Sequence, residues 1–206
     1  MANRPNGGRD RVIDADVVQL AEAHLGHCLH PAVLSHSQRV RHLALSMASA
    51  ADDLAALQIA ALFHDAGTAS DYNGPDRFEV EGAHAAARFL AARGWAPERI
   101  KPIWDAIALH TSPGIAENAG SLPCLIRKAV LIDFGSLPNP AGSAAMQALE
   151  LSYPRDGIER ILADLVVKQA LGAESVERKA PRASWPGLLT AGHSCVDPIT
   201  GLYPNF

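Results

Sequence analysis

The sequence has little of several features that define other kinds of protein. Aromatic residues make up 5% of the 206 residues and are not interleaved with basic ones, so we expect no stacking platform for nucleic acid. The formal net charge is −4 and there is no long basic segment, which argues against nonspecific polyanion binding. The three cysteines are far apart and form no CxxC pair, so neither a disulfide framework nor a zinc ribbon is predicted.

Long hydrophobic runs are also missing. No stretch approaches the roughly 18 consecutive apolar residues of a membrane span. The first dozen residues are polar and lack the apolar segment of a signal peptide. The hydrophobic fraction of 48% is typical of a soluble globular protein, and we expect a cytoplasmic location.

What the sequence does have is a helical pattern. Alanine and leucine dominate, and apolar residues recur at spacings of three and four, which predicts an all-α fold. Residues 1–172 are expected to form one helical domain, and residues 173–206, where Pro and Gly recur without period, an irregular tail packed on it. The expected helices span residues 14–25, 54–66, 78–93, 97–110, 125–134, 144–151 and 156–171, and one more begins after Pro31, with Ser35 as a plausible cap, and runs to Met47.

Nine histidines occur, and several stand in apolar helical surroundings. His64 and Asp65 are adjacent at the apolar end of one helix, where burial is costly unless the two side chains have a partner. A divalent ion is such a partner, because imidazole and carboxylate are both good ligands. Four further candidates lie on other expected helices: His36, His84, His110 and Asp133.

The order of these residues resembles the H…HD…H…D signature of the HD superfamily. The resemblance spans about residues 35–135 and implies a helical bundle that holds one divalent ion, with zinc, iron or manganese as the candidates. Carried over by position, the implied ligands are His36, His64, Asp65 and Asp133. Two His and two Asp leave open positions for water, as a catalytic site requires.

A narrower resemblance is to cyanamide hydratase-like HD proteins, which add water to a small nitrile-type substrate by means of zinc. Four strings carry it: residues 36–40 (HSQRV), 62–68 (LFHDAGT), 77–83 (RFEVEGA) and 107–114 (IALHTSPG). The implied reaction is the addition of a metal-bound hydroxide to a nitrile carbon. Fold analogy alone does not establish the substrate.

The sequence departs from HD proteins with two metals at one position. Such proteins often carry a His four residues before the glycine of the third string, and here that residue is Phe78. This argues against an ordinary second site, although His84 follows the glycine by two residues and could bind an ion in another geometry. A di-iron oxygenase, with His84 and His110 as ligands of the second ion, therefore stays open.

Four residues are candidates for catalysis or substrate binding. His110 and His84 could carry protons, because histidine titrates near neutral pH. Thr68 and Glu79 could line the pocket, as their motif positions imply, or Glu79 could be a solvated acid at a helix start. Arg39 could pair with a ligand carboxylate, bind an anion or lie at the surface.

The favoured function is thus a metal-dependent hydratase or hydrolase acting on a small molecule, without nucleic-acid or membrane partners. A phosphohydrolase acting on a nucleotide or phosphate ester is the main alternative. It is weakened because no cluster of Lys or Arg beside the ligands provides an evident phosphate clamp. A monomer and a homo-oligomer fit the sequence equally well.

Overall fold

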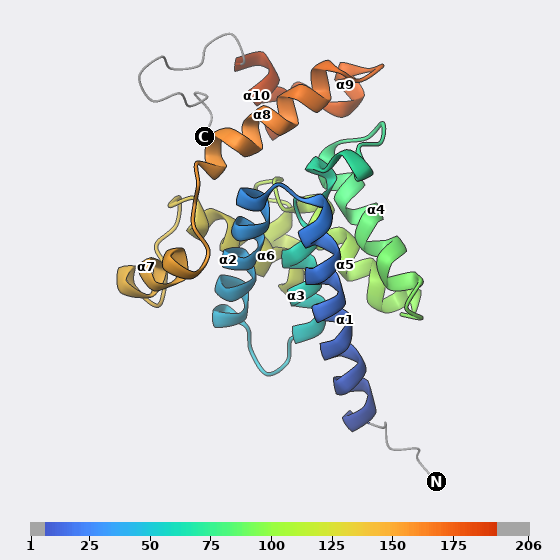
Figure 1. Ribbon diagram of the computed structural model, residues 1–206, viewed down its shortest axis with the longest axis vertical. Coiled ribbons are helices and arrows are strands. Elements are labelled where there is room, and N and C mark those ends of the chain that lie inside the picture. The colour runs from blue at the N-terminus through green and yellow to red at the C-terminus, as the bar shows by residue number, and fades with distance from the viewer. Residues whose placement is uncertain (1–6, 193–206) are drawn as a thin grey trace.

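The computed structural model describes residues 7–192, with the backbone alone for residues 7–15 (Figure 1). These residues form helices and no strand, which confirms the predicted all-α fold. The α-helices are α1 (Gly7–Cys28), α2 (Pro31–Met47), α3 (Leu54–Phe63), α4 (Phe78–Ala91), α5 (Pro97–Leu109), α6 (Ser121–Asp133), α7 (Ser143–Ser152), α8 (Ile158–Leu171), α9 (Val176–Lys179) and α10 (Trp185–Gly192). Three short 3-10 helices are η1 (Ala66–Thr68), η2 (Ser70–Tyr72) and η3 (Ala116–Asn118). In the described part of the chain, no helix is both long and apolar enough to cross a membrane.

The helix starts follow local capping chemistry. The Asp53 carboxylate accepts hydrogen bonds from the backbone N–H groups of Ala55 and Ala56, so α3 begins where an acidic cap predicts. Proline occupies the first turn of α2 and α5, where a missing N–H is harmless. As a result, most predicted helices agree with the observed ones to within a few residues.

Helix α3 is the centre of the bundle. It packs against α1, α2, α4, α5 and α6, and Figure 1 shows it enclosed by its neighbours. Its side chains from Ile59 to Phe63 are fully buried, as expected for a helix that is apolar on every face. The C-terminal end of this buried helix therefore lies in the interior of the domain.

Several segments differ from the sequence-based expectation. Helix α1 begins at Gly7 rather than at residue 14, and α6 begins at Ser121 rather than at residue 125. Helix α3 ends at Phe63, and the chain continues through His64 and Asp65 into η1 rather than staying α-helical to residue 66. In the expected irregular tail, α9 and α10 form, because Ser175 caps α9 and Pro186 lies in the first turn of α10. The rest of the expected tail, residues 193–206, lies outside the described residues.

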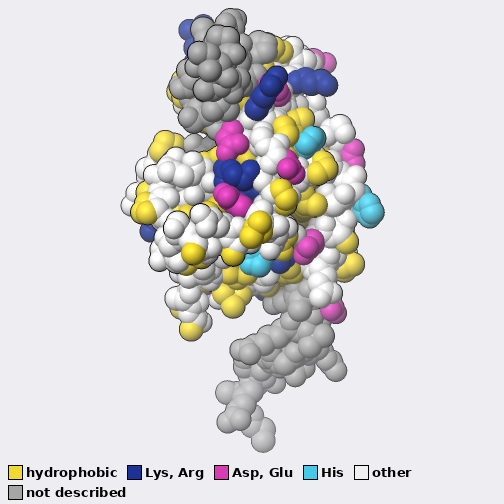
Figure 2. Space-filling model, turned by 60° about the vertical axis from the view of Figure 1, so that its left-hand side comes forward, with side chains coloured by type: hydrophobic (Ala, Val, Ile, Leu, Met, Phe, Trp, Pro, Cys, Tyr) yellow, Lys and Arg dark blue, Asp and Glu magenta, His cyan; other side chains and the backbone are white. Residues whose placement is uncertain are grey.

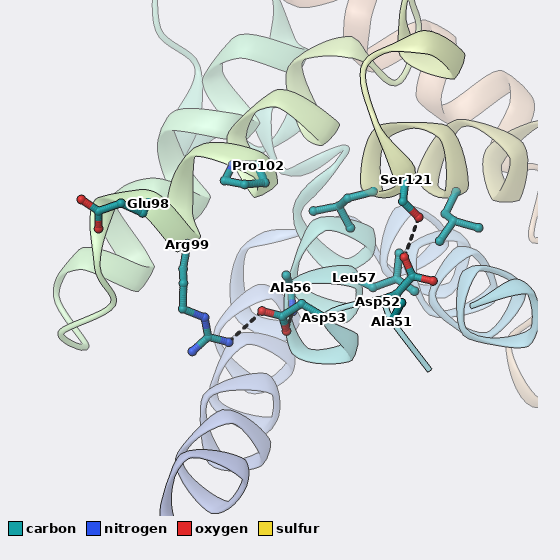
Figure 3. A pocket seen from close by; sticks show the side chains of 11 residues that line it. Ala51, Asp52, Asp53, Ala56, Leu57, Glu98, Arg99, Pro102 and Ser121 are labelled. Atoms are coloured by element: carbon teal, nitrogen blue, oxygen red, sulfur yellow. Dashed lines mark hydrogen bonds and ion pairs between the residues drawn. The ribbon is translucent and has the colours of Figure 1, made fainter. Parts of the chain in front are cut away.

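Two surface features complete the description. On the face shown in Figure 2, side chains of both charges are interspersed with apolar ones. A cavity of about 290 Å³ lies where α3, α5 and α6 begin (Figure 3). Its two main acidic groups already have partners, since Asp52 accepts from Ser121 and Asp53 pairs with Arg99. No histidine or cysteine lines this smaller cavity, and we assign no chemistry to it.

Candidate metal centre

The His64-Asp65 pair is held in place by a close backbone contact. A Cβ on Gly67 would overlap the carbonyl group of Phe78 and come within 2.8 Å of the Gly82 nitrogen. A Cβ on Gly82 would lie 3.0 Å from the Phe63 carbonyl oxygen. Only glycine leaves room for this approach, so the start of α4 packs directly on the chain that carries the pair.

Three buried side chains converge on one point. The Nε2 atoms of His36 and His64 lie 3.1 Å apart. The Oδ2 atom of Asp65 lies 3.5 Å from the His36 nitrogen and 3.2 Å from the His64 nitrogen. In the described part of the chain, this is the one group of three potential ligand residues whose donor atoms all lie within 4.8 Å of one another.

The other ring nitrogens fix the orientation of both imidazoles. The Nδ1–H of His36 donates to Asp133 at 2.7 Å, and the Nδ1–H of His64 donates to the Ala61 carbonyl oxygen at 2.8 Å. Each ring therefore directs its Nε2 atom at the common point. A hydrogen-bonded Nδ1 behind a ligating Nε2 is the usual arrangement at protein metal sites.

The residues fit a divalent cation. Two nitrogen lone pairs face each other, and Asp65 Oδ2 is buried without a hydrogen-bond partner, an expensive arrangement unless a cation lies between them. Burial lowers the pKa of His36, which favours the neutral form that binds metal. Burial alone would raise the pKa of Asp65, but the surrounding histidines outweigh it and hold that pKa well below its usual value.

Asp133 lies behind His36 in this structure. Its Oδ2 accepts from His36 Nδ1 and from Arg39 Nη2, and its Oδ1 accepts from Arg39 Nε at 2.7 Å. Although burial opposes ionisation, these partners hold the pKa of Asp133 well below its usual value. Direct ligation by Asp133 stays a prediction, while its contact with a ligand is observed. Arg39 is fully buried and pairs with this carboxylate, which settles the role left open for it.

His110 completes the group of buried polar side chains. Its Nδ1–H donates to the Ile107 carbonyl oxygen at 2.7 Å, and its Nε2 lies 3.4 Å from Asp65 Oδ1. The His64 and His110 rings meet edge to face, with centroids 5.0 Å apart. The predicted pocket histidine is therefore beside the ligands, with a basic nitrogen directed at them.

A cavity of about 590 Å³ opens from this group. The polar side includes His36, His64, Asp65 and His110. The other walls are mainly apolar and come from distant parts of the sequence: Pro113, Ile115, Val130, Leu131, Phe134, Leu162, Ala183, Trp185 and Leu188. This is the size and lining expected of a site for a small organic molecule.

The remaining predicted site residues do not line this cavity. The Thr68 hydroxyl donates to the Asp65 carbonyl oxygen at 2.7 Å, so Thr68 supports the chain of a ligand. Glu79 is fully buried and not a solvated acid, and it accepts from Arg77 and Thr111, which do line the cavity.

His84 lies elsewhere. Its Nδ1 accepts from Trp104 Nε1 at 3.3 Å, between α4 and α5. Residues two apart on a helix point about 200° apart. Since Gly82 faces the ligand segment, His84 faces away from it. The structure therefore does not bring His84 and His110 together.

Sequence reasoning missed two arginines in the cavity wall. Arg77 and Arg127 both line the cavity, although the sequence shows no cluster of Lys or Arg beside the predicted ligands. Each also pairs with a glutamate: Arg77 with Glu79, and Arg127 Nε with Glu117 at 2.6 Å. No local signal in the sequence indicates that these residues, 50 positions apart, share one cavity.

The fold and this ligand group agree with the comparison with protein families. The family model named HD domain matches residues 33–170, about two thirds of the chain, and the chain belongs to this family. The match includes the whole converging group and indicates a metal-dependent, hydrolase-type activity. The comparison with curated proteins gave no match.

Proposed function

We propose that the protein is a metal-dependent hydratase or hydrolase that adds water to a polarised carbon of a small organic molecule, in the manner of the cyanamide hydratase-like proteins. The observation that carries this proposal is one three-residue ligand group at one side of a largely apolar cavity. A divalent ion held there, with zinc as our first choice, would lower the pKa of a water molecule towards 7 and polarise the substrate.

The side chains of this protein have distinct roles in the proposed reaction. His36, His64 and Asp65 would hold the ion, and the hydrogen bond between His36 Nδ1 and Asp133 fixes the direction of that imidazole and leaves Nε2 for the ion. His110 Nε2 accepts the proton that water loses as its oxygen bonds to the substrate carbon. The proton then passes to the substrate nitrogen, so the addition of one water molecule is balanced.

A phosphohydrolase is the second candidate, and a specific observation favours it. Arg77 and Arg127 line the cavity, and guanidinium groups bind phosphate well. Their pairing with Glu79 and Glu117 offsets this charge, so we rank the candidate second. For a di-iron oxygenase, the described residues offer no second ligand group that contains His84.

The test begins with metal analysis of protein purified without added metal. The zinc-loaded, manganese-loaded and iron-loaded proteins are then assayed with cyanamide, small nitriles, nucleotides and a phosphate monoester. We expect nitrile hydration that His64→Ala and His110→Ala each reduce at least about 100-fold, because the first removes a ligand of the ion and the second removes a general acid-base group. His84→Ala is the matched control and should stay within about twofold. Phosphate release without hydration would favour the second candidate, and two irons per chain would favour the third.

A further inference from the structure

We infer that the substrate carries an aliphatic or aromatic group, and that Trp185 and Leu188 of α10 select for it. This inference rests on the proposed function and specifies its substrate class. The converging ligands define where the reactive group lies, while the cavity is far larger than cyanamide, with its three heavy atoms, would need. A cavity of about 590 Å³ falls in the range that encloses drug-sized molecules.

The selecting wall lies outside the segment matched by the family. That match ends at residue 170, whereas Ala183, Ser184, Trp185 and Leu188 all line the cavity. In Figure 1, α8, α9 and α10 lie together at the top of the bundle, beyond the end of α4. Residues 183–188 thus contribute to the cavity wall from beyond the matched segment.

Aromatic contacts connect this wall to the ligand group. The Trp185 ring meets the Phe78 ring edge to face, with centroids 5.9 Å apart. Phe78 in turn meets His110 with centroids 5.7 Å apart. A molecule with its reactive end beside His110 therefore has Trp185 within reach of its other end.

Leu188 supplies exposed apolar surface to the same wall. It is 45% exposed although it lines the cavity, and Trp185 is only partly buried. Val130 of α6, Phe134 at the C-terminal end of α6 and Leu162 of α8 line the same cavity. Covering this surface would favour a ligand with an apolar body, because each buried methylene strengthens binding about fourfold.

The wall is fixed to the domain by specific contacts. Lys179 Nζ donates to the Gly74 carbonyl oxygen at 2.7 Å, and Arg178 Nε pairs with Asp76 Oδ1 at 2.7 Å. Leu189 is fully buried, and Gly187 packs so tightly on Pro181 that a Cβ would overlap its carbonyl. A wall held in this way can discriminate by shape.

Isothermal titration with two hydroxamates tests the inference without needing turnover. Acetohydroxamate and hexanohydroxamate present the same metal-binding group, but the second has four more methylenes. With zinc-loaded protein we expect hexanohydroxamate to bind at least about tenfold more tightly. Leu188→Ala and Trp185→Ala should each reduce this preference to about threefold or less, while acetohydroxamate binding changes by less than about twofold. Leu171→Ala, at a leucine that is 54% exposed but lies outside the cavity wall, is the matched control.

The outcomes separate the two proposals. Equal binding of both hydroxamates, or a preference that survives both wall substitutions, would overturn the inference and leave the proposed function standing. If neither hydroxamate binds zinc-loaded protein, the ion is not accessible from the cavity and both proposals fall. A preference that is lost on substitution of the wall and unchanged in Leu171→Ala would support the inference.

Discussion

Replacing Arg39 with methionine should destabilise the protein strongly, because the Asp133 carboxylate would remain buried after losing its closest cation. The two side chains are fully buried and joined by two hydrogen bonds, at 2.7 Å and 2.9 Å. Arg39 also donates to the carbonyl oxygens of Tyr153 and Pro154, at 2.9 Å and 3.0 Å. Its removal therefore leaves three acceptor groups with fewer partners.

Removing one partner of a buried ion pair costs about 3–5 kcal/mol. The lower end applies here, since Arg155 Nη1 lies 3.8 Å from the same carboxylate and can offset part of the lost charge. A loss of about 3 kcal/mol corresponds to a fall of roughly 10 °C in Tm for a chain of this size. The metal-free protein should show the effect, because the Arg39–Asp133 ion pair forms without a metal ion.

Urea unfolding at pH 7, followed by circular dichroism, measures this loss. Arg41→Met is the matched control on the same helix, because Arg41 pairs with Glu22, which is 43% exposed, and should lose less than about 1 kcal/mol. In the double variant Arg39→Met/Asp133→Asn, removal of the carboxylate charge should recover at least about 1 kcal/mol. If Arg39→Met unfolds like Arg41→Met, the buried-pair argument is refuted.

Three further outcomes are expected. His64→Ala should lower zinc affinity more than about 100-fold in a chelator competition, because even residues behind a ligand contribute 10–100-fold, whereas His84→Ala should leave it unchanged. Gly67→Ala should lower the free energy of unfolding by more than about 3 kcal/mol in thermal unfolding, because its Cβ would overlap the backbone of Phe78. Gly26→Ala is the control and should change it by less than about 1 kcal/mol, because the nearest atom to its Cβ is 3.9 Å away. The difference in free energy of unfolding between the unmodified protein and Asp133→Asn should be complete above about pH 4 and should shrink on acidification, because the pKa of Asp133 is lowered in the folded state. A difference that stays constant from pH 7 to pH 3 would contradict this reasoning.

The parts of the fold that were predictable from sequence have local causes. The acidic cap at Asp53 and the proline at position 97 mark helix starts, and these are the starts observed, whereas α2 begins at Pro31 with His30 as its cap instead of Ser35. The predicted end of α3, at residue 66, was less accurate. Alanine and glycine at positions 66 and 67 do not reveal that the chain leaves the helix at His64 to meet α4.

The site was predictable in its ligands and less so in its surroundings. His36, His64 and Asp65 were predicted by order and type, and they converge as expected. His84 was ambiguous because its position in the motif is close to the ligands, whereas helical rotation turns it towards α5. The cavity walls depend on packing between remote helices, and no local periodicity encodes such contacts.

The converging group and one wall of the cavity come from separate stretches of this chain. The residues that would hold the ion lie between positions 36 and 65, while one whole wall of the cavity comes from residues 183–188. A library of substitutions at the wall could therefore change which molecules fit while the ligands stay untouched. In the same way, grafting residues 176–192 onto another HD domain would transfer a specificity without transferring a reaction. The cavity wall at residues 183–188 could therefore vary while the converging group of His36, His64 and Asp65 stays the same.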